Sequence, residues 1–385
     1  MIYLDNAAGS HPKAPGVEAA MIEALNSWGA NPGRGNYAFA RRTGEMVEQV
    51  RRRLAALIHA PDPGRLAFTS GATMSLNALV LGFARQLRGG EVIVSSMEHN
   101  ALLRPLYLLE DRGLLRLRMI PADGAGYVES RQVEAAINGD TRLIALSMAS
   151  NVCGSVQPVA EVGKIAKKHG LPLLVDASQS AGLLDIDVEA LGVSMLALAG
   201  HKYLLGPAGV GALWAAPEIG LAPLLHGGTG ADSEQRAMPG YWPARMEAGS
   251  LNTAGIAGLG AGLDFLAEQG RERLYRRAME LTAGLERELR RLPGITLQKR
   301  IEESRPRVPL LSFTVEGLTA GRVAELLDRR GVCVRSGYHC APEAHRTLGT
   351  FEEGTVRLSP GWANTERELE QACRAIADVA RGKAV

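Results

Sequence analysis

The chain has 385 residues, enough to bury a large core and to form two domains. Apolar residues make up 46% and charged residues 22%, as in ordinary globular proteins, and a net charge of +2 without basic–aromatic runs argues against nucleic-acid binding. The start lacks the basic and apolar regions of a signal peptide, so no signal peptide is expected there. The stretch 204–225 is apolar, but three prolines and Glu218 interrupt it, so it is not expected to span a membrane. The four cysteines fit neither a disulfide framework nor a zinc pattern, so we expect a cytoplasmic protein without a metal or membrane contact.

Seven short apolar runs alternate with helical patterns between about residues 60 and 215. Strands that are apolar throughout, rather than at every second position, indicate a mostly parallel sheet covered by helices on both faces. Helices are expected over 73–84 and 159–170. The expected strands are Arg65–Thr69, Glu91–Ser95, Leu115–Ile120, Leu143–Ser147, Pro172–Asp176, Met195–Ala199 and Gly209–Ala215.

The remainder of the chain predicts a loop region and a smaller α/β domain. Residues 216–250 are rich in Gly and Pro without a clear period, and a long helix is expected over 254–292 with a break near Gly270. Strands over 308–315, 332–335 and 355–359, and helices over 320–330 and from Thr365, follow. We therefore predict an N-terminal arm (1–14), a large domain (15–253) and a small domain (254–385) that opens with the long helix.

A lysine stands out at the end of a buried strand. Lys202 follows the apolar run 193–199 and precedes a Gly/Pro-rich loop, and lysine is scarce, with seven among 43 basic residues. Burial there would lower the pKa of its amine and make it a nucleophile, which arginine cannot become. The alternative is a lysine whose stem packs at the strand end while its charge reaches water.

Asp176 ends another buried strand, 26 positions before Lys202. A carboxylate at that place suits a helix cap, a metal ligand or a partner for a cationic heterocycle. Pyridoxal phosphate (PLP) needs a lysine for its aldehyde and a carboxylate for its pyridine nitrogen. The Asp176–Lys202 pair therefore suggests a PLP site.

Other loops at the same sheet edge carry compatible residues. Residues 69–73 form a small-residue turn before a helix, the geometry that cradles phosphate. His99 follows one strand and could stack on a planar ring, and Asn151 follows another. Any one of these residues could serve a purely structural role. Several loops with suitable chemistry follow strands at the same edge of the sheet, however, and this recurrence favours a functional role. Active sites of parallel sheets gather at that edge.

These residues also carry a family resemblance. Asn151…Gly154, 175–179, 200–202 and 335–342 resemble the class V aminotransferase superfamily of fold-type I PLP enzymes, and within it the cysteine desulfurase and selenocysteine lyase branch. The resemblance covers essentially the whole chain. It implies a large domain with a seven-stranded, mostly parallel sheet between helices, and a smaller C-terminal α/β domain.

The resemblance also implies roles for single residues. Lys202 would form the Schiff base with PLP, Asp176 would pair with the pyridine nitrogen, and His99 would stack on the ring. Gln179, with Asn151, would bond the phenolic oxygen, and Arg357 would bind the substrate carboxylate. The phosphate would lie near Ala72, Thr73 and His201 with Ser250 of a neighbouring subunit, and Tyr37, His339 and Asn151 would lie near the substrate. Ser250 thus implies a homodimer with composite sites.

Cys340 selects the chemistry. A buried, inert thiol is the ordinary state of cysteine, but the Gly-containing loop around Cys340 favours exposure. The resemblance implies that Cys340 takes sulfur from L-cysteine as a persulfide, releases alanine and passes the sulfur to an acceptor protein or thiol. Because cysteines are usually buried, Cys153, Cys333 and Cys373 are expected to be ordinary residues. Three alternatives remain open at this point: a selenocysteine lyase, a β-eliminating C–S lyase, and a non-catalytic PLP-binding scaffold for sulfur-transfer partners.

The chain departs from the family pattern at four positions. Ala199 and Ala72 lack hydroxyls that relatives offer to the phosphate, and tyrosines replace histidines at Tyr37 and Tyr338. Tyrosine donates a hydrogen bond but is a poor proton shuttle near pH 7. The departures bear on substrate preference and acceptor more than on the fold or the cofactor.

Overall fold

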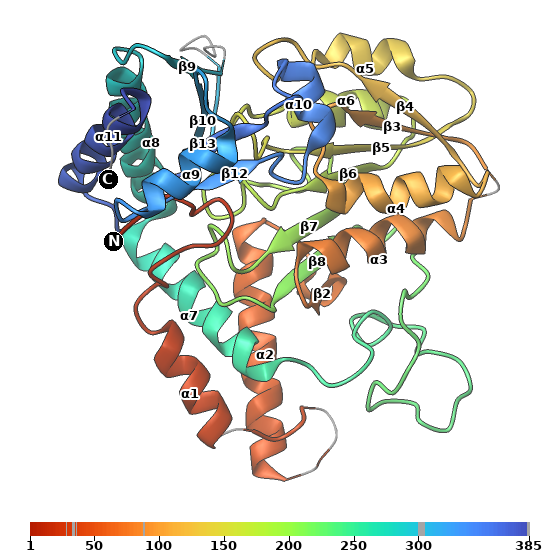
Figure 1. Ribbon diagram of the computed structural model, residues 1–385. Helices are drawn as coiled ribbons and strands as arrows, with labels where there is room; N and C mark the ends of the chain where they lie inside the picture. The colour runs from red at the N-terminus through yellow and green to blue at the C-terminus, as the bar shows by residue number, and fades with distance from the viewer. Residues whose placement is uncertain (28, 33–34, 36, 88, 299–304, 383–385) are drawn as a thin grey trace.

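Seven strands form the central sheet of the computed structural model, which describes residues 1–27, 29–32, 35, 37–87, 89–298 and 305–382 (Figure 1). The strand order is β2-β8-β7-β6-β5-β3-β4. Neighbours from β7 to β4 are parallel, whereas β8 runs antiparallel to β2 and β7. The predicted mostly parallel sheet is confirmed. Its strands are β2 (Leu66–Thr69), β3 (Glu91–Ser95), β4 (Arg116–Ile120), β5 (Thr141–Ser147), β6 (Leu173–Asp176), β7 (Met195–Ala199) and β8 (Gly211–Ala215).

Helices bury both faces of this sheet. In β7, Met195 and Ala197 face a core shared with α3 (Ala72–Ala84) and α4 (Asn100–Asp111). Leu196 and Leu198 face the opposite core. Successive side chains of a strand point to opposite faces, so a strand covered on both sides must be apolar throughout. The opposite core is shared with α2 (Ala38–Leu57), α6 (Val159–Lys168) and α7 (Thr253–Gln269), beside which lie α1 (Val17–Ser27), α5 (Ser130–Ala136) and the 3-10 turn Pro63–Arg65.

A second sheet forms the smaller C-terminal layer. Its order β12-β13-β10-β9 is antiparallel throughout, and Phe313 and Val356 pack from it against three helices. The helix expected from Thr365 starts there, because Thr365 and Glu368 form a capping box. The elements are α8 (Arg271–Leu289), β9 (Ile295–Leu297), β10 (Leu311–Val315), α9 (Ala320–Asp328), β12 (Arg335–Gly337), β13 (Thr355–Leu358) and α11 (Glu366–Ala380).

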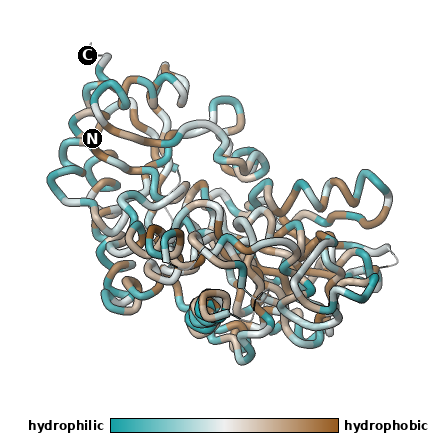
Figure 2. The backbone as a smooth tube through the Cα atoms, turned by 90° about the horizontal axis from the view of Figure 1, so that it is seen from below, coloured by the Kyte–Doolittle hydropathy of each residue, from teal (hydrophilic) through white to brown (hydrophobic). Residues whose placement is uncertain are grey.

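The N-terminal segment closes onto this smaller layer. β1 (Ile2–Tyr3) pairs in parallel with β11 (Val332–Cys333), and Asp5 bridges to Ser359. Both chain ends lie at the same end of the molecule in two views at right angles (Figures 1 and 2). The prediction of one continuous strand over 332–335 is therefore wrong. This segment is two short strands, β11 and β12, because the chain leaves the arm's sheet to join the second sheet.

The break predicted near Gly270 is confirmed, since Gly270 has a φ of +79° between α7 and α8. The domain boundaries at residues 14 and 253 stay predictions. Ile256, Leu259 and Leu263 of α7 pack in the core of the large sheet, whereas α8 packs in the core of the second sheet. This packing favours a boundary at Gly270.

Candidate active site

A cavity of about 370 Å³ opens at the carboxyl ends of β5, β6 and β7. Its lining brings together residues that lie far apart in the sequence. Of the predicted site residues it includes Ala72, Thr73, His99, Asn151, Asp176, Gln179, His201, Lys202, His339, Cys340 and Arg357. The sheet edge predicted from the strand pattern is therefore where these side chains meet.

Lys202 lies in the turn that follows β7. The Leu205 N–H donates to the Lys202 carbonyl at 3.0 Å, and the Gly206 N–H donates to the Gly200 carbonyl at 2.8 Å. Burial lowers the pKa of Lys202 to about 8, with the positive charges of Arg357 and Arg335 adding to the effect and Asp176 opposing it. A larger share of this amine is unprotonated near neutral pH than in an exposed lysine.

Asp176 lies at the end of β6 with one oxygen engaged. Its Oδ1 accepts from the Ser178 N–H at 2.9 Å and from Ser178 Oγ at 2.5 Å. Within the described part of the chain, no hydrogen bond reaches Oδ2. Because the carboxylate lines the cavity, Oδ2 is the oxygen suited to a cationic partner there.

His99 is the N-cap residue of α4. Its Nδ1 accepts from the Ala101 N–H at 3.0 Å, so the ring proton lies on Nε2. Burial lowers the pKa of His99 to about 4, with Lys202 contributing and Asp176 opposing. The imidazole at the cavity wall is therefore neutral near pH 7 and would not repel a cationic ring stacked against it.

The turn from β2 into α3 forms another wall of the cavity. Ser70, Gly71, Ala72 and Thr73 line it, and Gly71 adopts φ +145°, a conformation that favours glycine. A Cβ at Gly71 would meet no atom within 4 Å, so this side of the turn is open. The first N–H groups of a helix lack intrahelical partners and attract anions. This wall is suited to a phosphate.

Arg357 lines the cavity and is almost fully buried, with 2% of its surface exposed. Its Nη2 lies 2.8 Å from Asp5 Oδ1, and its Nη1 donates to the Asn151 carbonyl at 2.9 Å. Its Nε is buried without a partner among the described residues. A carboxylate that entered the cavity would meet a guanidinium held in place by Asp5.

Cys340 lies in the loop between β12 and α10 (Pro342–Leu348), and its side chain is exposed. Two consecutive residues have left-handed backbones there, His339 at φ +48° and Cys340 at +59°. Asn151 Nδ2 donates to the His339 carbonyl at 2.6 Å, and the Asn100 N–H donates to the Cys340 carbonyl at 2.7 Å. The loop is thus held by Asn151, which lines the cavity, and by Asn100 at the start of α4, while its thiol stays accessible.

The chain does not bring every predicted residue to the cavity. Ser250 is exposed and accepts a hydrogen bond from Asn31, and Tyr37 is 55% exposed at the start of α2. Neither lines the cavity of this subunit. Asn151 and His339 line it, but the Asn151 amide nitrogen is engaged by the loop, and His339 Nε2 lies 3.0 Å from Thr355 Oγ1.

Two residues at or beside the cavity were not singled out from the sequence. Arg335 lines the cavity, and its Nη2 lies 3.9 Å from Cys340 Sγ. Ser178 holds Asp176 through two hydrogen bonds. Both stand inside motifs that the family resemblance uses. A sequence signal for Arg335 was its place on a strand five residues before Cys340.

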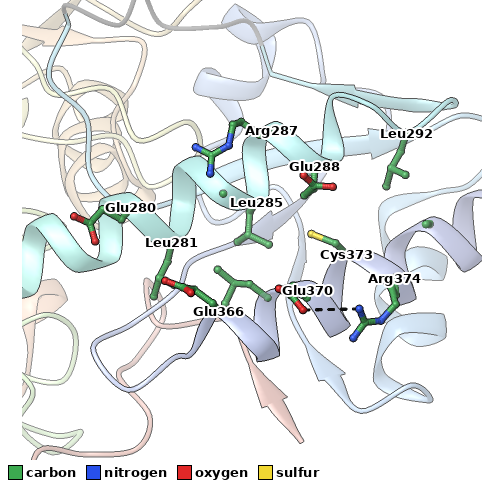
Figure 3. Close-up of a pocket in the computed structure, with 13 residues that line it drawn as sticks. Glu280, Leu281, Leu285, Arg287, Glu288, Leu292, Glu366, Glu370, Cys373 and Arg374 are labelled. Atoms are coloured by element: carbon green, nitrogen blue, oxygen red, sulfur yellow. Dashed lines mark ion pairs between the residues drawn. The ribbon is translucent and has the colours of Figure 1, made fainter.

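The other cysteines differ from Cys340. Cys153 and Cys373 are buried, and burial raises the pKa of Cys373 to about 11 and also raises that of Cys333. Cys373 lines a separate cavity of about 640 Å³ between α8 and α11. Figure 3 shows Leu281 and Leu285 of this cavity between Arg287 of α8 on one side and the Glu370–Arg374 ion pair of α11 on the other. Protonated thiols are poor nucleophiles, so Cys333 and Cys373 fit the ordinary role predicted for them, and the burial of Cys153 fits it as well.

The residues present fit PLP. The cavity holds a lysine of lowered pKa, a carboxylate with one available oxygen and an open helix N-terminus. Gln179 donates through Nε2 to the Ala7 carbonyl, which leaves its buried Oε1 without a partner among the described residues. An unpartnered buried polar atom facing a cavity favours a polar ligand there.

Residues 2–372 match the family described as aminotransferase class-V, and the chain belongs to that family. Within it the chain belongs to the PLP-dependent cysteine desulfurase branch. A probable cysteine desulfurase of Methanothermobacter thermautotrophicus is 36% identical over 98% of this chain and 94% of its own length. One of Pseudomonas aeruginosa is 33% identical over 96% and 92%.

Solved structures agree with this placement. The apo cysteine desulfurase from Thermococcus onnurineus NA1 is 31% identical, with a TM-score of 0.92 over 99% of this chain and 95% of its own. A cysteine desulfurase from Escherichia coli is 28% identical, with a TM-score of 0.88 over 99% and 94%. The fold expected from the sequence is confirmed.

Proposed function

We propose that this protein is a cysteine desulfurase that takes the sulfur of L-cysteine onto Cys340 and releases L-alanine. The observation that carries the proposal is the position of Cys340. Its exposed thiol lines the same cavity as Lys202 and lies 3.9 Å from the Arg335 guanidinium. The desulfurase names of the chain's relatives support the same reaction.

Each residue of the cavity has a defined part in this reaction. Arg357 and Arg335 would bind the substrate carboxylate, and Asp176 Oδ2 would hold the proton on the pyridine nitrogen. Bound PLP supplies an electron sink that weakens the bonds at the substrate's α- and β-carbons. The Lys202 amine, which burial leaves close to half unprotonated near pH 8, would carry the substrate's α-proton.

The sulfur transfer uses the Cys340 thiolate. Its sulfur forms a bond to the sulfur of the substrate, the Cβ–S bond breaks, and the electron pair of that bond stays with the carbon. A proton on that carbon then completes alanine. The persulfide on Cys340 passes its outer sulfur to an acceptor thiol by exchange. The exposure of the loop supports access by an acceptor protein or thiol.

Product identification tests the proposal. Purified protein loaded with PLP is incubated with L-cysteine or L-selenocysteine, with and without a reductant. Alanine with a protein-bound persulfide is expected from L-cysteine. Pyruvate and ammonia would indicate a β-eliminating lyase, a reaction confined to L-selenocysteine would indicate a selenocysteine lyase, and no turnover with bound PLP would indicate the scaffold.

We also propose that the active unit is a homodimer with composite sites, in which Ser250 reaches the phosphate of the partner subunit. Its support is that Ser250 is exposed and lies away from the cavity of its own subunit. Mixed dimers of Lys202→Ala and Ser250→Ala subunits test this. One site of each mixed dimer would contain intact Lys202 and Ser250, so activity should return on mixing, whereas sites built within one subunit would leave the mixture inactive.

A cytoplasmic location remains a proposal. Its support is that all four cysteines are free thiols. Among the described residues, no helix combines the length and the apolar character that a membrane crossing demands. Fractionation of cells that produce the protein tests the location.

A further inference from the structure

Glu98 is a fully buried carboxylate next to His99, with 0% of its surface exposed. It does not line the cavity, and the reaction above gives it no part. Its pKa is raised to about 7, chiefly by burial, with hydrogen bonds opposing the rise and Asp176 adding to it. Burying a carboxylate without a cationic partner is costly, so its hydrogen bonds must hold it.

Three hydrogen bonds from two strands converge on Glu98. Ser95 Oγ, at the end of β3, donates to Oε1. The Ser147 N–H and Ser147 Oγ, at the end of β5, both donate to Oε2 at 2.7 Å. Glu98 therefore connects the ends of two neighbouring strands of the central sheet.

The same turn is fixed from further directions. The Met97 N–H donates to Ser95 Oγ at 3.0 Å, and the Ser96 N–H donates to the Ile120 carbonyl at 2.9 Å. These hydrogen bonds fix the backbone conformation of residues 95–98, which lead into α4. His99 is the next residue, and its ring orientation follows from this conformation and from the Ala101 N–H bonded to Nδ1.

We propose that Glu98 is a positioning residue that holds the His99 imidazole at the cavity wall through its hydrogen bonds to Ser95 and Ser147. The proposal rests on the proposed function, in which His99 stacks on the ring of PLP. Glu98 acts here by geometry rather than by charge. A glutamine could keep that geometry, because its Oε1 can accept from Ser147 and its amide nitrogen can donate to Ser95 Oγ.

The test is a double-mutant cycle between Glu98 and His99 in the full-length protein. Apo protein is titrated with PLP, and the dissociation constant and the induced circular dichroism of the bound ring are measured. Glu98→Ala is expected to weaken PLP binding by about tenfold and to reduce the dichroic signal. Glu98→Gln is expected to stay within about threefold of the unmodified protein.

In the His99→Ala background, Glu98→Ala should add no further loss, because the residue through which it acts is gone. Equal losses in both backgrounds would overturn the proposal, and so would a Glu98→Gln variant as weak as Glu98→Ala. Neither result would contradict the proposed desulfurase reaction. Failure of the unmodified protein to bind PLP would instead contradict the proposed function and the role of His99 with it.

Two further variants guard against general damage. Glu91→Ala removes another buried glutamate from the opposite end of β3, bonded to Arg118 and Asn138, and should leave the PLP dissociation constant unchanged. If Glu98→Ala does not fold, Ser95→Ala decides, since it removes one of the three donors. A smaller loss that disappears in the His99→Ala background supports the proposal, and an additive loss overturns it.

Discussion

Arg335 and Arg357 are direct partners across the antiparallel ladder of β12 and β13. Like charges opposite one another on a sheet are destabilising unless a negative charge compensates them. Asp5 compensates Arg357 with an ion pair of 2.8 Å, whereas Arg335 approaches Cys340 Sγ. Both guanidinium groups line the cavity. The pair is therefore suited to an anionic substrate.

Removal of the Arg335 guanidinium should weaken substrate binding. Arg335→Ala is expected to lower kcat/KM for L-cysteine by about 10- to 100-fold, the value of a charge-assisted hydrogen bond of about 1.5–3 kcal/mol. Steady-state kinetics measure it. Arg322→Ala, which removes an exposed arginine of α9, is the control. Unchanged kcat/KM in Arg335→Ala would exclude a contact with the substrate.

Capture of PLP by the apo protein should depend on pH through Lys202. Only the unprotonated amine attacks the aldehyde, so the rate should rise with pH and level off above about 8. Stopped-flow absorbance between pH 6 and 10 measures this, with Lys202→Ala as the blank. A rate that continues to rise to pH 10 would mean that the amine keeps the pKa of an exposed lysine.

Cys340→Ser should separate cofactor binding from sulfur transfer. Because no hydrogen bond joins the Cys340 side chain to Lys202 or Asp176 among the described residues, PLP absorbance should persist. Alanine formation from L-cysteine should fall to the level of the Lys202→Ala variant. The matched control is Cys333→Ser, expected to turn over normally. Full sulfur release by Cys340→Ser without added thiol would remove Cys340 from the mechanism.

Stability should depend on a buried ion pair between α2 and the segment before Ser250. Arg51, 2% exposed, bonds Glu247 through two nitrogens at 2.7 and 3.1 Å. Glu247→Gln is expected to lower the free energy of unfolding by about 3 kcal/mol, because the buried guanidinium would keep only the half-exposed Glu48 as an ionic partner.

Urea denaturation measures this difference. Asp264→Asn breaks the exposed pair with Arg53 and should change the free energy of unfolding by less than about 1 kcal/mol. Equal effects of the two substitutions would contradict the role of burial.

The Cys340 loop should loosen when Asn151 loses its amide. Asn151→Ala removes the 2.6 Å hydrogen bond to the His339 carbonyl, which costs about 1–3 kcal/mol for a buried acceptor. Limited proteolysis should then cut between residues 338 and 341 faster than in Asn138→Ala, which alters a site away from the cavity. An equal cutting rate would show that the loop holds its conformation without Asn151.

The sequence predicted the sheet well because its central strands, unlike the edge strand β4, are buried on both faces. Val175 and Leu196, for example, belong to apolar runs with no polar alternation, and such runs fit a parallel sheet. The small domain was harder to predict. Val332 and Arg335 lie in one β-like run, yet they belong to different sheets, and only the position of β1 separates them.

The sequence predicted which side chains form the site, but it did not predict which residues contact one another there. Lys202 and Asp176 follow strands whose ends must meet, so their proximity follows from topology. The Asp5–Arg357 and Asn151–His339 contacts join positions that are 352 and 188 residues apart. No local pattern encodes such pairs. They depend on how the small domain packs against the large one.

The N-terminal arm supplies three separate supports to the catalytic floor. Asp5 pairs with Arg357, the Ala7 carbonyl accepts from Gln179, and the Ser10 N–H and the Lys13 ammonium both donate to the His201 carbonyl beside Lys202. Proteolytic trimming of about a dozen residues would thus inactivate the enzyme without touching a residue that meets the substrate.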